Sequence, residues 1–265
     1  MSTPASPPAS AGPAATPVPK PAVPAPLSGD LQDTGSVRRA SVRARSWNVR
    51  GGAKVLGDVE VETAILQGIV SIRGTVRAQS FRVDGTLDTS STVQVAGPLE
   101  VHGTAASHGS VQAGSWELNG SGKVGGELTV TAAAHWKGHL EVAGGLTAGS
   151  VEFEGTLAAS GDLVAPTIVG RLKGASHVAN IRASRLTLTR PGLLPPMQTG
   201  ALTAVRIDGQ TVHLEGVEAE LVKAEHVTLG PGCHIAAVEG RLDAVHPSSH
   251  VGPESRSRRP YGLSR

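Results

Sequence analysis

Residues 76–127 consist of three consecutive segments with one pattern: VRAQSFRVDGTLDTSST (76–92), VQVAGPLEVHGTAASHGS (93–110) and VQAGSWELNGSGKVGGE (111–127). Their first residues belong to an apolar column that recurs every 17 or 18 positions: Val59, Val76, Val93, Val111, Leu128, Leu146 and Leu163. A second column contains Phe81, Leu99, Trp116, Ala134 and Val151, and a third contains Val70, Leu87, Ala105, Gly122, Leu140 and Leu157. Apolar-x-apolar units at these positions indicate short strands with one buried face.

The repeat length predicts a solenoid, in which each turn buries its apolar face by stacking on its neighbours. Three short strands per repeat predict an all-β fold, a three-sided parallel β-helix. Glycines keep the same step and are expected at its corners, where the backbone bends sharply: Gly68, Gly85, Gly103, Gly120, Gly138 and Gly155. The small residues Ala105 and Gly122 are the weakest points of the third column.

Composition favours a narrow solenoid over a globular enzyme. Only 2% of the 265 residues are aromatic, and a thin triangular core has room for few large rings. The net charge of +2 is too small to predict nucleic acid as a partner. Cys233 is the single cysteine, so the chain has no intramolecular disulfide framework. No apolar run reaches the roughly 18 residues of a membrane span.

Changes in composition divide the chain into three parts. Residues 1–54 are expected to form a disordered tail, rich in proline up to about residue 30 and basic after that. Residues 55–245 are predicted to form the β-helix, with regular turns over 55–165, an irregular part over 166–200 that contains four prolines, and further turns over 201–245. Residues 246–265 are expected to be a second disordered basic tail. The proline-rich stretch has no signal-peptide core, which favours a cytoplasmic protein.

The repeated Gly-x-(Leu/Val)-x-(Val/Ala) units and the proline-rich N-terminal stretch resemble the bactofilins, the polymer-forming cytoskeletal proteins of bacteria. The segments 205–215 and 222–235 are similar to the longer members of Gram-positive bacteria. This resemblance implies a right-handed β-helix that joins end to end into filaments, without nucleotide or another cofactor, at the inner face of the cell membrane. It also implies the expected partners: further copies of the chain, an anionic membrane surface, and other cytoskeletal or cell-wall proteins.

The ends of a β-helix independently favour self-assembly. The terminal strands carry unpaired N–H and C=O groups, which are a template for pairing with another chain. A polar cap or a helix usually covers such ends. The sequence contains no strongly helical capping segment, so we expect the ends to join; the alternative is that the tails fold over them.

One basic segment is a candidate membrane contact. It contains Arg38, Arg39, Arg43, Arg45, Trp47 and Arg50. Arginines near an anionic lipid surface each contribute about 1 kcal/mol, and a tryptophan between them could insert at the interface. The alternative interpretation is a solvated linker.

Two enzyme classes with β-helical folds are alternatives to a scaffold. Residues 229–235, LGPGCHI, resemble one unit of the hexapeptide acyltransferases, but those enzymes need many clean tandem units. A γ-class carbonic anhydrase would need three histidines that converge from neighbouring turns. His135 and His139 share one segment, whereas the other histidines fall at unrelated phases of the repeat. Asp84, Asp88 and Asp162 are isolated and are interpreted as turn residues. We therefore expect no catalytic, cofactor or metal site.

Overall fold

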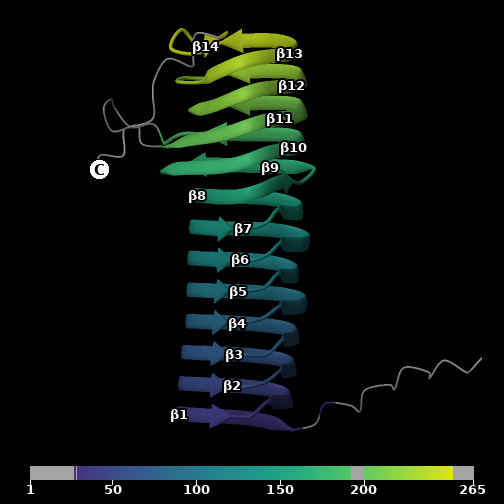
Figure 1. The fold of residues 1–265 in the computed structure, drawn as a ribbon, viewed down its shortest axis with the longest axis vertical. Coiled ribbons are helices and arrows are strands. Elements are labelled where there is room, and N and C mark those ends of the chain that lie inside the picture. Colours follow the sequence, from purple (N-terminus) through teal and green to yellow (C-terminus); the bar gives the residue numbers. More distant parts are fainter. Residues whose placement is uncertain (1–26, 28, 192–199, 253–265) are drawn as a thin grey trace, which may run out of the picture.

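The structure is a computed structural model that describes residue 27, residues 29–191 and residues 200–252. Fourteen strands form one parallel sheet in which each strand pairs with the next along the chain, so the described residues form a single elongated stack (Figure 1). Most strands are 13–15 residues long and bend around corners, so that one strand makes most of a turn. The predicted all-β parallel solenoid is confirmed, while its right-handed sense stays a prediction.

The first half of the stack contains β1 (Asp30–Arg39), β2 (Val42–Val55), β3 (Val59–Ile72), β4 (Val76–Thr89), β5 (Val93–Ser107), β6 (Val111–Val124) and β7 (Leu128–Val142). The second half contains β8 (Leu146–Val164), β9 (Thr167–Leu172), β10 (Ala175–Thr189), β11 (Ala201–Leu214), β12 (Val217–Leu229), β13 (His234–Val245) and β14 (His250–Val251). Residues 192–199, within the part expected to be irregular, lie outside the described residues.

Each turn has three faces, and each face points one apolar-x-apolar pair inward. In β3 these buried pairs are Val59 and Val61, Ala64 and Leu66, and Val70 and Ile72. The parallel register places the three predicted columns directly above one another, turn after turn. Leu163 is buried as well and pairs with Ile181 one turn further on. The predicted core is therefore confirmed.

The weak points of the third column have a physical explanation in the neighbouring column. A Cβ built on Gly122 would stand 2.8 Å from the Leu118 side chain, 3.1 Å from Leu140 and 3.7 Å from the indole ring of Trp116. Leu118, Leu140 and the indole therefore fill the volume that Gly122 leaves open, whereas a cavity of about 20 Å³ remains beside Ala105. In the next two turns, Trp136 of β7 and Phe153 of β8 stack with their ring centroids 4.7 Å apart. The few large rings of this core thus depend on small residues placed next to them.

The alternation between 17 and 18 residues is confined to one corner. Inward residues on either side of the first corner are three apart in β4 and β6, Ala78 to Phe81 and Ala113 to Trp116. They are four apart in β5, Val95 to Leu99, and between β3 and β8 the sheet register shifts only at this corner. In these turns the other two corners keep a constant length, and the extra residue therefore leaves the columns in phase. Further along, the register between β12 and β13 shifts at another corner, between Lys223 and His226.

Another corner is lined by stacked glycines. Gly51, Gly68 and Gly85 pair with one another in successive turns, and the column continues through Gly155. Each has a φ between +120° and +148°, a backbone conformation that side chains rarely adopt. A Cβ at any of them would also collide with the carbonyl oxygen of the glycine one turn earlier. Here the predicted corner glycines are required by both conformation and space.

The boundary at residue 55 is wrong, because the basic segment already forms part of the solenoid. β1 and β2 pair in register with the turns that follow, and Val42 stacks beneath Val59. Val42, Ala44, Trp47 and Val49 are buried. The arginines between them occupy outward positions, so the high charge of this segment concealed the alternation of a strand. At the other end, β14 (His250–Val251) lies within residues 246–265, which were expected to be a disordered tail, so this boundary is also wrong. Residues 1–26, 28 and 253–265 lie outside the described residues.

Val111→Asp is expected to unfold the middle turns, because an unpaired carboxylate in this core costs several kcal/mol. Val111 is 2% exposed, whereas its neighbour Gln112 points outward. Gln112→Asp is therefore the matched control and should leave the thermal unfolding midpoint, followed by circular dichroism, almost unchanged. Equal tolerance of the two changes would contradict the register.

Gly51→Ala and Gly52→Ala should separate the conformational requirement from a general need for glycine. Gly51 has a φ of +120°, and a Cβ there would meet the Gly35 carbonyl, whereas a Cβ at Gly52 would make ordinary contacts at 3.7 Å or more. We expect Gly51→Ala to destabilise the protein by at least about 1–2 kcal/mol. Gly52→Ala should be neutral or slightly stabilising in the same denaturant titration.

Candidate functional surfaces

The basic segment does not form one patch, because the solenoid distributes it over several faces. Arg43 lies outward on the first face, where it pairs with Glu60 at 3.4 Å. Arg45 lies at the following corner and pairs with Asp30 at 3.3 Å. Arg50 and Arg38 lie further round the turn, and both are exposed. The candidate membrane residues therefore encircle the N-terminal end of the stack.

Trp47 is buried, which corrects the expectation that it inserts into a membrane. Its side chain is 1% exposed, and its indole N–H donates to the Asp33 carboxylate at 3.0 Å. Arg39 Nε donates to the same carboxylate at 2.8 Å. Asp33 itself is 4% exposed. Trp47 and Arg39 thus help to close the N-terminal end of the core.

The charge of Asp33 is favoured by these contacts. The hydrogen bond from Arg39 holds the pKa of the Asp33 carboxyl below its ordinary value, and the Trp47 N–H lowers this pKa further. Burial opposes the shift. Asp33, with its partners Arg39 and Trp47, therefore occupies the position one turn before Val49, where a continued column of apolar residues would otherwise be expected. We call Asp33, Arg39 and Trp47 the polar cap.

The C-terminal end has the opposite character. Val238, Leu242 and Val245 in β13 pair in register with Val222, Val227 and Leu229 of β12, which are all buried. The β13 residues occupy the same inward positions, but Leu242 is 40% and Val245 41% exposed. Within the described residues, β14 covers β13 at only two positions, His234 and Ile235. We call Val238, Leu242, Val245 and Val251 the apolar end; Val251, in β14, is 43% exposed.

The flanks of the solenoid carry opposite charges in neighbouring turns. Lys123 and Glu141 lie 2.9 Å apart, and Lys173 and Glu154 lie 2.7 Å apart. Arg82 contacts both Asp84 in its own turn and Glu100 in the next. The pKa of Asp84 is lowered by hydrogen bonds from Arg82 and then from His102. These pairs cross from turn to turn and leave a mixed, hydrated surface of the kind that resists lateral association.

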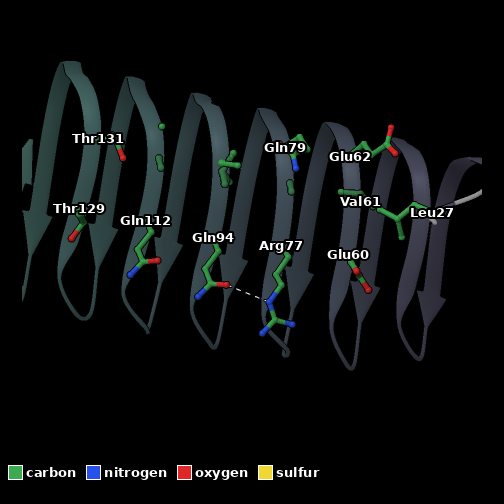
Figure 2. A pocket seen from close by; sticks show the side chains of 15 residues that line it. Leu27, Glu60, Val61, Glu62, Arg77, Gln79, Gln94, Gln112, Thr129 and Thr131 are labelled. Atoms are coloured by element: carbon green, nitrogen blue, oxygen red, sulfur yellow. Dashed lines mark hydrogen bonds between the residues drawn. The ribbon is translucent and has the colours of Figure 1, made fainter. Parts of the chain in front are cut away.

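A shallow groove of about 690 Å³ runs along one flank from β3 to β7. Figure 2 shows two rows of side chains along it: one row contains Glu60, Arg77, Gln94, Gln112 and Thr129, and the other contains Glu62, Gln79 and Thr131. Ala96 and Gly114 complete the second row with small residues. The groove follows the corner whose length alternates. Sequence reasoning did not identify it, because no single residue type marks it.

The candidates for enzyme chemistry do not converge. Asp84 contacts Arg82 and His102, Asp162 contacts Asn180 and Arg182, and His108 lies 3.7 Å from Asp88. His139 contacts the Thr156 hydroxyl at 2.7 Å. Across the described ranges, no group of three or more His, Cys, Asp or Glu residues could hold a metal ion.

Cys233 and Ile235 from the hexapeptide-like segment are buried core residues. Burial raises the pKa of the Cys233 thiol, which donates to the Leu214 carbonyl at 3.2 Å. A thiol in this setting behaves as a core residue and not as a nucleophile. In the part of the chain that the structure describes, no helix is long and apolar enough to cross a bilayer.

A segment of 64 residues, 24% of this chain, is 38% identical to the uncharacterized protein YhbF of Bacillus subtilis (strain 168). The match spans only 27% of the length of YhbF. No protein-family model matches the chain, and no solved structure matches it. The chain is therefore a β-solenoid protein with distant similarity to YhbF.

Asp33→Asn should loosen the N-terminal turns, which hydrogen exchange of the β1 and β2 amides would detect. The pKa of Asp33 is lowered from 3.8, so its contribution to stability is present above that value and is lost as the pH falls through the lowered folded value. The variant should therefore exchange faster than the wild type at pH 7, and the difference should shrink in strong acid. A difference that does not depend on pH would contradict the role of the charge.

Proposed function

We propose that this protein is a non-enzymatic cytoskeletal scaffold that self-assembles end to end, without nucleotide. The observation that supports the proposal is the apolar end: Leu242 and Val245 occupy core positions, but no turn of the described chain covers them. The resemblance of the repeats to the bactofilins points in the same direction. In this proposal the principal partner is a further copy of the chain.

The physics of the apolar end favours association. Complete burial of a valine or leucine side chain contributes roughly 1.5–3 kcal/mol, so covering the half-exposed Leu242, Val245 and Val251 would contribute a few kcal/mol in total. The edge of β13 adds backbone groups that can pair with a second strand. Because these terms come from side chains and backbone alone, no nucleotide is required.

The polar flanks favour an assembly that grows along the axis of the solenoid over one in which copies associate side by side. Their ion pairs are exposed and hydrated, and separating them from water would bring little gain. The flanks also carry some exposed apolar side chains, of which Ile69 in β3 is the most exposed at 68%; the others are Leu56, Ile65, Val169 and Val205. These flank residues are scattered over or near β3, β9 and β11, whereas the apolar end is a contiguous set that continues the core.

We also propose that the scaffold works at the inner face of the cell membrane, together with other cytoskeletal or cell-wall proteins. Arg38 and Arg50 are exposed at the N-terminal end, where an anionic surface would attract them. Trp47 has no part in this contact, because it is buried. Membrane attraction would therefore be electrostatic and would weaken with salt.

The double substitution Leu242→Lys with Val245→Lys should abolish assembly, because it places two charges on the apolar end. We expect the wild-type protein to sediment as large assemblies at tens of micromolar, equally with and without ATP or GTP. The double variant should sediment as a small species with an unchanged β-sheet circular dichroism spectrum.

Ile69→Lys is the matched control, since it removes an even more exposed apolar side chain from the flank and should leave assembly intact. A strictly monomeric wild-type protein would contradict the scaffold proposal. Normal assembly of the double variant would show that another surface joins the copies.

A further inference from the structure

We propose that the groove along β3–β7 binds the proline-rich segment of the same chain, with residues 18–26 lying along it in polyproline II conformation. The first evidence is the position of Leu27, which lines the groove beside Val61 and Glu62 of β3 (Figure 2). Leu27 precedes β1 in the chain, yet it lies next to the third strand of the stack. Leu27 itself therefore lies at the β3 end of the groove.

The second line of evidence is a match between two repeats. Polyproline II has three residues per turn and a rise of about 3.1 Å, so positions three apart share a face at intervals of about 9.3 Å. Neighbouring turns of the solenoid are about 4.8 Å apart, so two turns span about 9.6 Å. Leu27, Pro24, Pro21 and Val18 share such a face, and all four are apolar. With Leu27 at β3, Pro24 falls at β5 and Pro21 at β7.

The composition of the groove fits this occupant. A polyproline II backbone has no internal hydrogen bonds, and its carbonyl groups need donors. Gln94 and Gln112 line one wall and can donate amide N–H groups. Ala96 and Gly114 leave space on the opposite wall, where larger side chains would obstruct a backbone. The ring of proline also restricts the free segment, which lowers the entropy lost on binding.

A charged residue near the far end of the proline-rich segment agrees with the proposed orientation along the groove. Residues 2–26 contain one charged side chain, Lys20. In polyproline II, Lys20 lies about 22 Å from Leu27, just beyond the four turns or about 19 Å that separate β3 from β7, which Glu127 directly precedes. A second hollow of about 380 Å³ continues the groove there; it shares Thr129 with the first and is lined by Glu127. Glu127 is exposed and can pair with the Lys20 ammonium group.

Disulfide formation in the full-length protein tests both the docking and its register. Two cysteine pairs should form intramolecular links under mild oxidation: Pro24→Cys with Gln94→Cys in β5, and Pro21→Cys with Thr129→Cys in β7. A disulfide requires Cα atoms within about 7 Å, which is less than the two-turn spacing. The exchanged pair, Pro24→Cys with Thr129→Cys, should therefore link at least tenfold less. Cys233 is buried and is retained in every variant.

Two further controls make the result decisive. Thr104→Cys with Pro24→Cys uses an exposed residue of β5 on another face and should link as poorly as the exchanged pair. Ala96→Arg, added to the Pro24 and Gln94 pair, should reduce linkage several-fold by filling the groove without affecting the thermal melt. Peptide mapping identifies each link. Equal yields for all pairs, or links that join two chains into a dimer, would overturn the proposal. The test does not depend on filament formation.

Discussion

Each turn of this protein is stable because the turns on either side cover its apolar side chains and pair with its backbone. A single turn buries too little surface to fold alone, and stability accumulates through contacts between neighbours. Identical positions therefore stack in columns, whether they are valines in the core, glycines at a corner or charges on a flank. The two ends are the places where this mutual coverage stops, and they carry the proposed function.

Much of the fold could be predicted because stacking imposes its period on the sequence. The valine column from Val59 and the corner glycines are visible without any structure. The N-terminal boundary could not be placed in the same way, because Trp47 and its neighbours alternate with arginines, and charge concealed the strand. Composition gives the number of charged residues in a segment but not the direction in which their side chains point. Burial depends on which face of the strand each residue occupies.

The candidate surfaces were harder to predict, for a related reason. Leu242 and Val245 have the same spacing as buried column residues, and only the absence of a covering turn in the described chain exposes them. The polar cap was hidden because Trp47 lies 14 residues after Asp33 and meets it only when β1 and β2 stack, although Arg39 belongs to the same strand as Asp33. The groove depends on the shape of a corner over five strands. Each is a property of neighbouring turns and not of one segment.

The corner between the first and second faces has an evolutionary consequence, because it accommodates turns of 17 or 18 residues. A residue inserted elsewhere in a turn would move inward side chains outward. At this corner the insertion is absorbed locally, and the other faces remain aligned. Insertions and deletions should therefore accumulate there among related chains, and longer loops could be grafted there without disturbing the stack. In the regular turns from β3 to β8, the fold thus provides one corner where length varies while the repeat is maintained.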